Sequence, residues 1–298
     1  MKYLMVFLAV AFLATVPVLA QDAPPKAAPI TSKLIVFNGT DSEGITSGMA
    51  LDIAGSFNDW KVQAEPLYEV SPKIWLGFLR VYEGSWNGVQ VKSKGTWDLK
   101  WDLEGLAVAM TGSTIVGTAA EAKAAKLVFF DGNNVSGLTD ATKLELQGIP
   151  GSPAPLYRIA PKFWVGLAHG DPGTYDVKVA GKGSARSWSL TGGTGTSKLT
   201  IDASPASLPQ LIVFDGKKAG LADNVQLDVT GDYSNWNKNG FPLTRVANGF
   251  WIGLLWAEKD TWTLQVKTKG SFDKMWALDG TPVGEKEGTD FDLKAVSR

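Results

Sequence analysis

The sequence lacks cysteine and contains a single histidine, His169. Without cysteine the chain can form no disulfide framework, no thiolate zinc site and no iron–sulfur cluster, and it has no thiol nucleophile. A single imidazole excludes a multi-histidine metal centre, and a Ser–His–Asp triad would have to use His169 itself. We therefore predict no metal site and no cofactor.

The sequence also lacks an excess of charge of either sign. It has 29 Lys and Arg residues against 30 Asp and Glu residues, with no basic block. Because nucleic-acid binding depends on clustered Lys and Arg, we predict no nucleic-acid partner. Carboxylates are common, so counting does not exclude a glycosidase-like pair, but no pair recurs across the repeats described below at a spacing that would set one distance. The sequence therefore predicts a protein that is not an enzyme and has no catalytic residues.

The apolar run at the N-terminus has the features of a signal peptide. Met1 and Lys2 give a positive start, an apolar run extends over 3–13, and a small-residue cleavage site ends at Ala20. We predict a signal peptide over 1–20, a flexible proline-rich leader over 21–31, and no membrane span after cleavage. The protein would then be exported to the periplasm or the cell exterior. The alternative is an uncleaved N-terminal anchor.

The rest of the chain contains three copies of one unit, spaced by about 90 residues. Each copy begins with an apolar strand that ends in Asn or Asp and Gly, and continues with a strand that carries Trp followed two residues later by Gly. A Lys-Gly turn and another Trp come after these strands. The first strands are 34–39, 127–132 and 211–216, and the Trp strands are 74–78, 163–167 and 250–254.

A repeat of this length is long enough to form an independent domain. Short β-branched and aromatic runs, punctuated by Gly, Asn, Asp and Pro, indicate about seven antiparallel strands in each copy. The predicted fold is all-β, with three tandem immunoglobulin-like antiparallel β-sandwich domains in a row after the signal peptide. The predicted segments are repeat 1 over 32–118, a connector over 119–125, repeat 2 over 126–203, a linker over 204–209 and repeat 3 over 210–298.

Tryptophans that occur in all three copies are predicted to pack in the domain cores, because the fold rather than a ligand requires them. These are Trp75, Trp164 and Trp251. The later set, Trp101, Trp188 and Trp276, is predicted to lie in the core or at a strand edge. Strand alternation also predicts that Trp262 is buried, and that Asp52, Glu145 and Asp228 face solvent. For Trp86, alternation leaves an outward position and a strand edge equally open.

One loop distinguishes the outer repeats from the middle one. Residues 55–60 read Gly-Ser-Phe-Asn-Asp-Trp, and residues 231–236 read Gly-Asp-Tyr-Ser-Asn-Trp. The corresponding segment of repeat 2, 148–153, has no aromatic residue. A tryptophan that the middle copy lacks is not needed by the fold, so Trp60 and Trp236 are candidates for ligand contact. A protein interface and local packing are the other readings.

The pattern Gly-Ser-Phe-Asn-x-Trp, followed by Pro-Leu and by further tryptophans, resembles the glycogen-binding domain of the AMP-activated protein kinase β subunit. It is also similar to the N-terminal modules of glycogen-branching and debranching enzymes and to related starch-binding modules. The resemblance covers most of repeats 1 and 3, and reaches repeat 2 only through the shared framework. It implies an α-glucan ligand bound on a platform of two tryptophans, a lysine and an asparagine.

The resemblance places the platform residue by residue. The first tryptophan corresponds to Trp60 and Trp236, and the second to Trp97 and, in repeat 3, to Phe272. The lysine falls on Gln90 and Gln265 in the outer repeats and on Lys178 in repeat 2, while the asparagine of the last strand has no match. With the loop asparagines, the predicted ligand-binding residues are Trp60, Trp97, Gln90, Asn58, Trp236, Phe272, Gln265 and Asn235. Alternation predicts that Gln90 and Gln265 point outward, opposite their apolar neighbours.

Two main functions follow from these observations, and an enzyme subunit that acts on polysaccharide is a third alternative. The first is an exported, non-catalytic carbohydrate-binding protein, whose outer repeats bind α-glucan while the middle repeat acts as a spacer. Two platforms would raise the avidity for a polymer if they faced the same side. The second is a structural or assembly protein of the cell envelope or of an extracellular filament, in which the exposed Trp loops mediate self-association or contact an envelope protein.

Overall fold

The computed structural model describes residues 30–292 except 63, 83, 109–111, 118–124, 149–152, 170–172, 182–186, 194–196, 200–207, 248 and 258–260. The predicted signal peptide lies outside the described residues, as do nearly all of the leader and most of the two connecting segments, 119–125 and 204–209. Strand β1 begins at Ile30, so the last two residues of the predicted leader belong to a strand.

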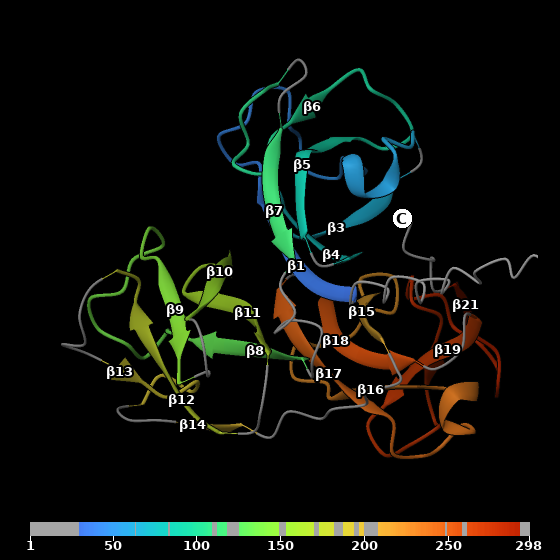
Figure 1. Ribbon diagram of the computed structural model, residues 1–298. Helices are drawn as coiled ribbons and strands as arrows, with labels where there is room; N and C mark the ends of the chain where they lie inside the picture. Colours follow the sequence, from blue (N-terminus) through green and yellow to red (C-terminus); the bar gives the residue numbers. More distant parts are fainter. Residues whose placement is uncertain are drawn as a thin grey trace, which may run out of the picture.

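The described chain folds into three all-β domains, each built on a seven-stranded antiparallel sheet (Figure 1). This confirms the predicted fold class of three tandem β-sandwich domains. Domain 1 contains β1 (Ile30–Asn38), β2 (Leu51–Ala54), the 3-10 helix η1 (Ser56–Asn58), β3 (Glu65–Ser71), β4 (Ile74–Tyr82), β5 (Gly84–Ser93), β6 (Lys100–Trp101) and β7 (Ser113–Gly117). Domain 2 contains β8 (Ala125–Asp131), β9 (Leu144–Gln147), β10 (Ala154–Ala160), β11 (Phe163–His169), β12 (Gly173–Val179), β13 (Ser187–Trp188) and β14 (Ser197–Leu199). Domain 3 contains β15 (Leu208–Asp215), β16 (Leu227–Gly231), the 3-10 helix η3 (Asp232–Ser234), β17 (Phe241–Ala247), β18 (Phe250–Ala257), β19 (Thr261–Thr268), β20 (Met275–Trp276) and β21 (Thr289–Asp292).

The three domains share one strand order. In domain 1 the order is β1-β4-β3-β2-β5-β6, with β7 paired to β5, and domains 2 and 3 repeat it strand for strand. The sheet folds over so that its two halves face each other across a core. We call β1, β4 and β3 the inner half of domain 1, and β2, β5, β6 and β7 the outer half. The inner halves of domains 2 and 3 are β8, β11, β10 and β15, β18, β17, and the remaining strands form their outer halves.

Each domain core is built around one Phe and two Trp rings. In domain 1 the ring centroid of Phe37 lies 5.9 Å from that of Trp75 and 6.2 Å from that of Trp101. Equivalent rings make equivalent contacts in domain 2 (Phe130, Trp164 and Trp188) and domain 3 (Phe214, Trp251 and Trp276). All six tryptophans are buried, as is Trp262, which confirms the prediction made from their recurrence and parity. Trp86 is half-buried against the domain 1 core, and its indole N–H donates to the carbonyl of Tyr82.

The inner half of each domain is buried on both faces. In β1, Ile35 and Phe37 pack into the core of domain 1, whereas Leu34 and Val36 point to the opposite side. That opposite side is covered by the other two domains. A second apolar cluster, which we call the junction, collects these side chains from all three domains: Leu34, Val70, Ile74 and Leu76, then Ala125, Leu127, Ile159, Val165 and Leu167, then Leu211, Val213, Val246, Phe250 and Ile252.

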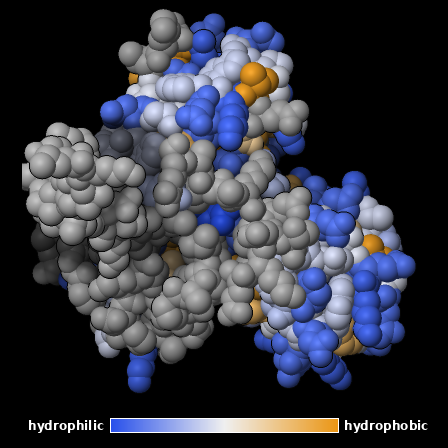
Figure 2. Space-filling view, turned by 45° about the vertical axis from the view of Figure 1, so that its right-hand side comes forward, coloured by the Kyte–Doolittle hydropathy of each residue, from blue (hydrophilic) through white to orange (hydrophobic). Residues whose placement is uncertain are grey.

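The domains meet around this junction in a cyclic order. Strand β1 contacts β11, β8 contacts β18, and β15 contacts β4, so each domain uses its first strand against the fourth strand of another. Figure 1 accordingly shows the inner strands at the centre of the molecule, with one domain on each of three sides. The predicted arrangement of three sandwiches in a row was wrong, because apolar faces that a linear array would expose are buried against one another. On the coloured surface in Figure 2, hydrophobic residues form only small, separate spots.

A charge placed in the junction should separate the domains. We expect Leu76→Asp, at a side chain with 0% exposure, to lower the free energy of unfolding by more than about 3 kcal/mol, because the carboxylate has no partner there. Small-angle X-ray scattering should show a larger radius of gyration. The matched control is Leu106→Asp at a residue with 64% exposure, which should change neither quantity. Equal compactness of the two variants would contradict the junction.

Candidate functional site

The Trp60 loop of domain 1 is held by its own asparagine. The side-chain oxygen of Asn58 accepts a hydrogen bond from the backbone N–H of Gly55 at 3.1 Å, and its amide nitrogen donates to the carbonyl of Ile53 at 3.4 Å. Asn58 is buried, so both ends of its amide are used within the loop rather than offered to a ligand. After η1, Asp59 and Trp60 both adopt left-handed backbone conformations, with φ of 53° and 55°. This turn carries the Trp60 side chain to the surface, where it is 40% exposed.

Trp60 and Trp97 form a pair of neighbouring rings. Their centroids lie 6.1 Å apart and their planes are tilted by 45°. The Trp60 ring lies against Gly88 of β5, so closely that a Cβ at that position would come within 2.6 Å of it. Gly88 therefore provides the space that the ring occupies. The structure brings these two predicted platform residues together on the outer half of domain 1.

A buried lysine connects the two loops that carry these rings. The Nζ of Lys92 donates to Oδ1 of Asp52 at 2.8 Å and to the carbonyl of Val62, in the Trp60 loop, at 2.6 Å. The same nitrogen lies 5.1 Å from the centre of the Trp97 ring. Such a cation–π contact is stronger when the cation is removed from water, as Lys92 is. The ammonium group thus holds one loop by a hydrogen bond and the other by its ring.

The predicted outward position of Gln90 was wrong. Gln90 is only 2% exposed, although it lies on the strand face opposite the core, as alternation requires. Gly88 and Lys92 flank it on the same face of β5, and the rings of Trp60 and Trp97 cover these two neighbours. Gln90 therefore lies on a covered part of β5, and its amide is not offered to solvent at the rim of the rings.

The predicted solvent exposure of the strand carboxylates was also wrong for two of the three. Asp52 and Asp228 are 1% and 3% exposed, because each pairs with a buried lysine of the neighbouring strand: Asp52 with Lys92, and Asp228 with Lys267 at 3.6 Å. Glu145 is partly buried. The outer strands thus have polar residues on the face opposite the core, but loops rather than water cover them in domains 1 and 3.

The strand register corrects the residue correspondence of the lysine. Val91, Val177 and Val266 each pair with the second core Trp of their domain. The residues that follow them, Lys92, Lys178 and Lys267, are therefore equivalent, whereas Gln90 and Gln265 correspond to Asp176. The lysine is therefore present in all three domains. In domains 1 and 3 it lies two residues after the glutamine to which the sequence comparison had assigned it. The recurring Val-Lys pair is the sequence signal that identifies it.

Domain 3 repeats this arrangement with one change. Asn235 and Trp236 have φ of 50° and 56°, Asn235 is exposed, and Lys267 donates to the carbonyl of Lys238 in the Trp236 loop. The Lys267 Nζ lies 5.1 Å from the centre of the Phe272 ring, and burial lowers the pKa of this lysine while Asp228 opposes that effect. Within the described residues no ring contact joins Trp236 and Phe272, and Trp236 is half-buried. Trp236 is therefore less exposed than Trp60, and the described residues give it no ring contact with Phe272.

Gln265 is fully buried in domain 3, so its predicted outward position was wrong as well. Its amide nitrogen lies 3.4 Å from the sulfur of Met275. Tyr233 also anchors the Trp236 loop from the side, because its hydroxyl donates to the carbonyl of Val229 at 2.6 Å. The Tyr233 ring contacts Trp262 and Phe241 at 5.5 and 5.8 Å, and burial raises the pKa of its hydroxyl to about 12.

The middle domain has the lysine without the aromatic loop. Lys178 is partly exposed, and its Nζ lies 3.0 Å from Oε1 of Gln147 and 3.4 Å from a carboxylate oxygen of Asp176. Most of the segment that replaces the Trp loop, 149–152, lies outside the described residues. No aromatic residue occurs in this segment, so domain 2 has no counterpart of Trp60.

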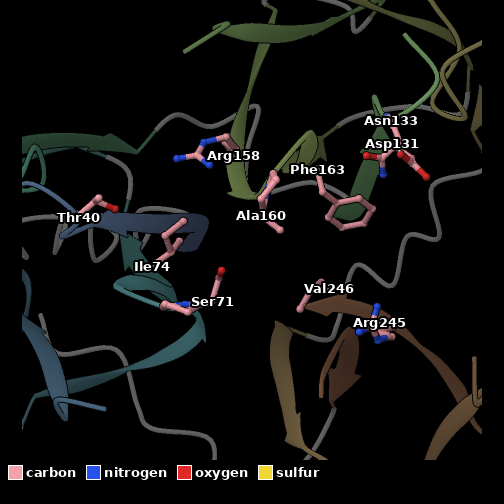
Figure 3. A pocket seen from close by; sticks show the side chains of 12 residues that line it. Thr40, Ser71, Ile74, Asp131, Asn133, Arg158, Ala160, Phe163, Arg245 and Val246 are labelled. Atoms are coloured by element: carbon pink, nitrogen blue, oxygen red, sulfur yellow. Dashed lines mark hydrogen bonds between the residues drawn. The ribbon is translucent and has the colours of Figure 1, made fainter. Parts of the chain in front are cut away.

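A separate cavity of about 700 Å³ lies where turns of the three inner halves meet (Figure 3). Ile74, Phe163 and Val246 contribute apolar surface to it, one from each domain. Its two arginines are paired within their own domains: Arg158 with Asp140 at 3.3 Å, and Arg245 with Asp223. No residue of the two aromatic sites lines this cavity. It is a consequence of how the domains meet and not part of the candidate site.

The chain matches no protein-family model and no curated protein. The candidate site is therefore defined by geometry: an exposed Trp on a left-handed turn, a second ring beside it, and a buried ion pair beneath. Within the described residues, no group of three His, Cys, Asp or Glu is placed to hold a metal ion. None of the helices in that part of the chain has the length and apolarity of a membrane span.

Replacing Lys92 tests the contribution of the buried ion pair between Lys92 and Asp52. We expect Lys92→Met to lower the free energy of unfolding by about 3–5 kcal/mol, because it leaves the carboxylate of Asp52 buried without its cation. Adding Asp52→Asn should recover part of this loss, since the remaining side chain is neutral. Urea unfolding measures both changes. Lys94→Met, at an exposed lysine of the same segment, is the control and should have little effect. A loss no larger than that of the control would contradict the role of Lys92.

The raised pKa of Tyr233 predicts a pH dependence of stability. The folded protein keeps the phenol protonated up to about pH 12, whereas the unfolded chain releases the proton near the ordinary tyrosine pKa of 10.0. The stabilisation is therefore complete below pH 10 and is lost as the pH rises towards 12, by about 2 kcal/mol. Tyr233→Phe lacks this contribution, so its disadvantage relative to the wild type should shrink over that interval. Urea unfolding of both proteins at pH 9 and pH 11.5 measures the difference in their free energies of unfolding. A difference that does not change with pH would contradict the raised pKa of Tyr233.

Proposed function

We propose that the protein is an exported, non-catalytic carbohydrate-binding protein whose ligand is an α-glucan. The observation that carries the proposal is the exposed Trp60 ring beside Trp97, supported from beneath by Gly88 and Lys92. Domain 3 would bind through Trp236 and Phe272. Export to the periplasm or the exterior rests on the N-terminal apolar run.

The backbone at Trp60 and Trp236 supports a functional role. A non-glycine residue with φ near +55° costs about 1–3 kcal/mol, and such residues cluster at functional sites. Both outer domains keep two consecutive residues in this conformation, and the second is Trp in each case. The turn carries an indole that is 40% exposed in domain 1 and half-buried in domain 3.

The chemistry of the rings suits a hexose. A sugar ring has an apolar face of C–H groups and a rim of hydroxyls, and an indole buries the face. The buried Gln90 and the engaged Lys92 are not free to bind the rim, so stacking supplies most of the affinity. Because no exposed cation of the site takes part, we expect the binding of a neutral glucan to depend little on salt.

Truncation of the two loop tryptophans tests the proposal. In a glycogen pull-down, Trp60→Ala with Trp236→Ala should weaken retention at least about tenfold, the equivalent of 1.4 kcal/mol, because the stacking surface is removed. Leu106→Ala, at an exposed apolar residue outside the site, is the matched control and should bind as the wild type does. Unchanged retention of the double variant would exclude the proposed site.

A structural role in an envelope or filament is the second candidate. It is favoured by Val62, which is 48% exposed on the same loop as Trp60 and which sugar stacking does not need. An exposed Trp and Val together would suit a contact with another protein or a second copy. Sedimentation of the purified protein separates the two functions. Association that Trp60→Ala abolishes, and that maltoheptaose does not affect, would favour the structural role.

A further inference from the structure

The two aromatic sites lie on the sides of their domains that face away from the molecular centre. In domain 1 the inner half turns its second face to the junction, and the outer half turns one face to the domain core. Gly88 and Lys92, which support the rings, lie on the remaining face of the outer half. In domain 3, Lys267 and Phe272 occupy the equivalent face. Figure 1 shows the loops after β2 and β16, with their 3-10 helices, at the periphery of the molecule.

The cyclic order of the domains sets the angle between these sites. Equivalent strands of the three domains make equivalent contacts around the junction. Equivalent surfaces of domains 1 and 3 are then related by about one third of a turn, as in a closed three-fold arrangement. The two sites therefore point in different directions and do not form one continuous surface. The equivalent surface of domain 2 points in the third direction and has no Trp loop.

The junction keeps this angle fixed. Apolar side chains of all three domains interdigitate there, including the fully buried Leu76, Val165 and Ile252. A polar contact adds to it between domains 1 and 3. With the Gln210 amide oriented so that its oxygen faces Arg80, that oxygen accepts hydrogen bonds from the guanidinium at 2.9 and 3.2 Å. Turning both sites to one side would require the domains to separate and expose this apolar surface to water.

We propose that the protein cross-links separate glucan chains. The proposal rests on the proposed function and adds a consequence of the cyclic arrangement. A glucan segment stacked on Trp60 would have to bend around the molecule to reach Trp236, and ordering that length of chain costs conformational entropy. A second chain, or a branch of a second particle, reaches the free site without that cost. One protein then bridges two chains, and domain 2, which lacks a Trp loop, offers no site for a third chain.

Light scattering from glycogen particles tests the cross-linking. Adding wild-type protein to glycogen should raise the scattering, and a large excess of protein should lower it again, because each chain is then capped by singly bound protein. Trp60→Ala and Trp236→Ala, each alone, should still be retained by glycogen but should lose the rise in scattering, since each has one site left. Maltoheptaose should reverse the rise by occupying both sites. Leu106→Ala is the control and should behave as the wild type does.

The outcomes separate this proposal from the one on which it rests. If the wild type is not retained by glycogen at all, the carbohydrate-binding function is wrong and cross-linking falls with it. If the wild type is retained and does not raise the scattering, carbohydrate binding stands and cross-linking is overturned. If a single variant raises the scattering as much as the wild type, the bridging does not use two sites in one chain, and the proposal is also overturned.

Discussion

The structure depends on the burial of three apolar sheet faces against one another. In each domain the strands of the inner half carry apolar residues on both faces, one for the domain core and one for the junction. An isolated domain of this sequence would expose the second face to water, which is unfavourable in proportion to the apolar area. Packing three such faces together in a cycle removes all of them from water. The domains are therefore parts of one unit and not independent modules on a string.

Because the inner halves are buried on both faces, the charged residues of the candidate sites lie on the outer halves. In domains 1 and 3 a lysine and an aspartate lie buried on the outer half, although removing such a pair from water costs free energy that its attraction only partly offsets. The cost is understandable where the lysine also holds the Trp loop and the neighbouring ring. In domain 2, which has no Trp loop, the equivalent Lys178 remains partly exposed.

The sequence predicted the repeats, the three all-β domains and the core tryptophans, because these depend on periodicity and recurrence. It also contained the signal for the junction: the runs 34–37 and 74–76 are apolar without alternation, which is typical of strands buried on both faces. That signal does not say which surface covers the second face. The outward position of Gln90 was mispredicted for a related reason, since alternation gives the face of a strand but not the loop that lies over it.

A single spectrum can test whether glucan contacts Trp60, Trp97 and Trp236, and no tryptophan of domain 2. The chain has 12 tryptophans, each with one indole N–H signal in a ¹⁵N-labelled sample. On addition of maltoheptaose, the signals of these three residues should shift while those of Trp164 and Trp188 stay in place. A spectrum without shifts, or one in which the buried tryptophans of domain 2 respond as strongly as Trp60, would contradict the account.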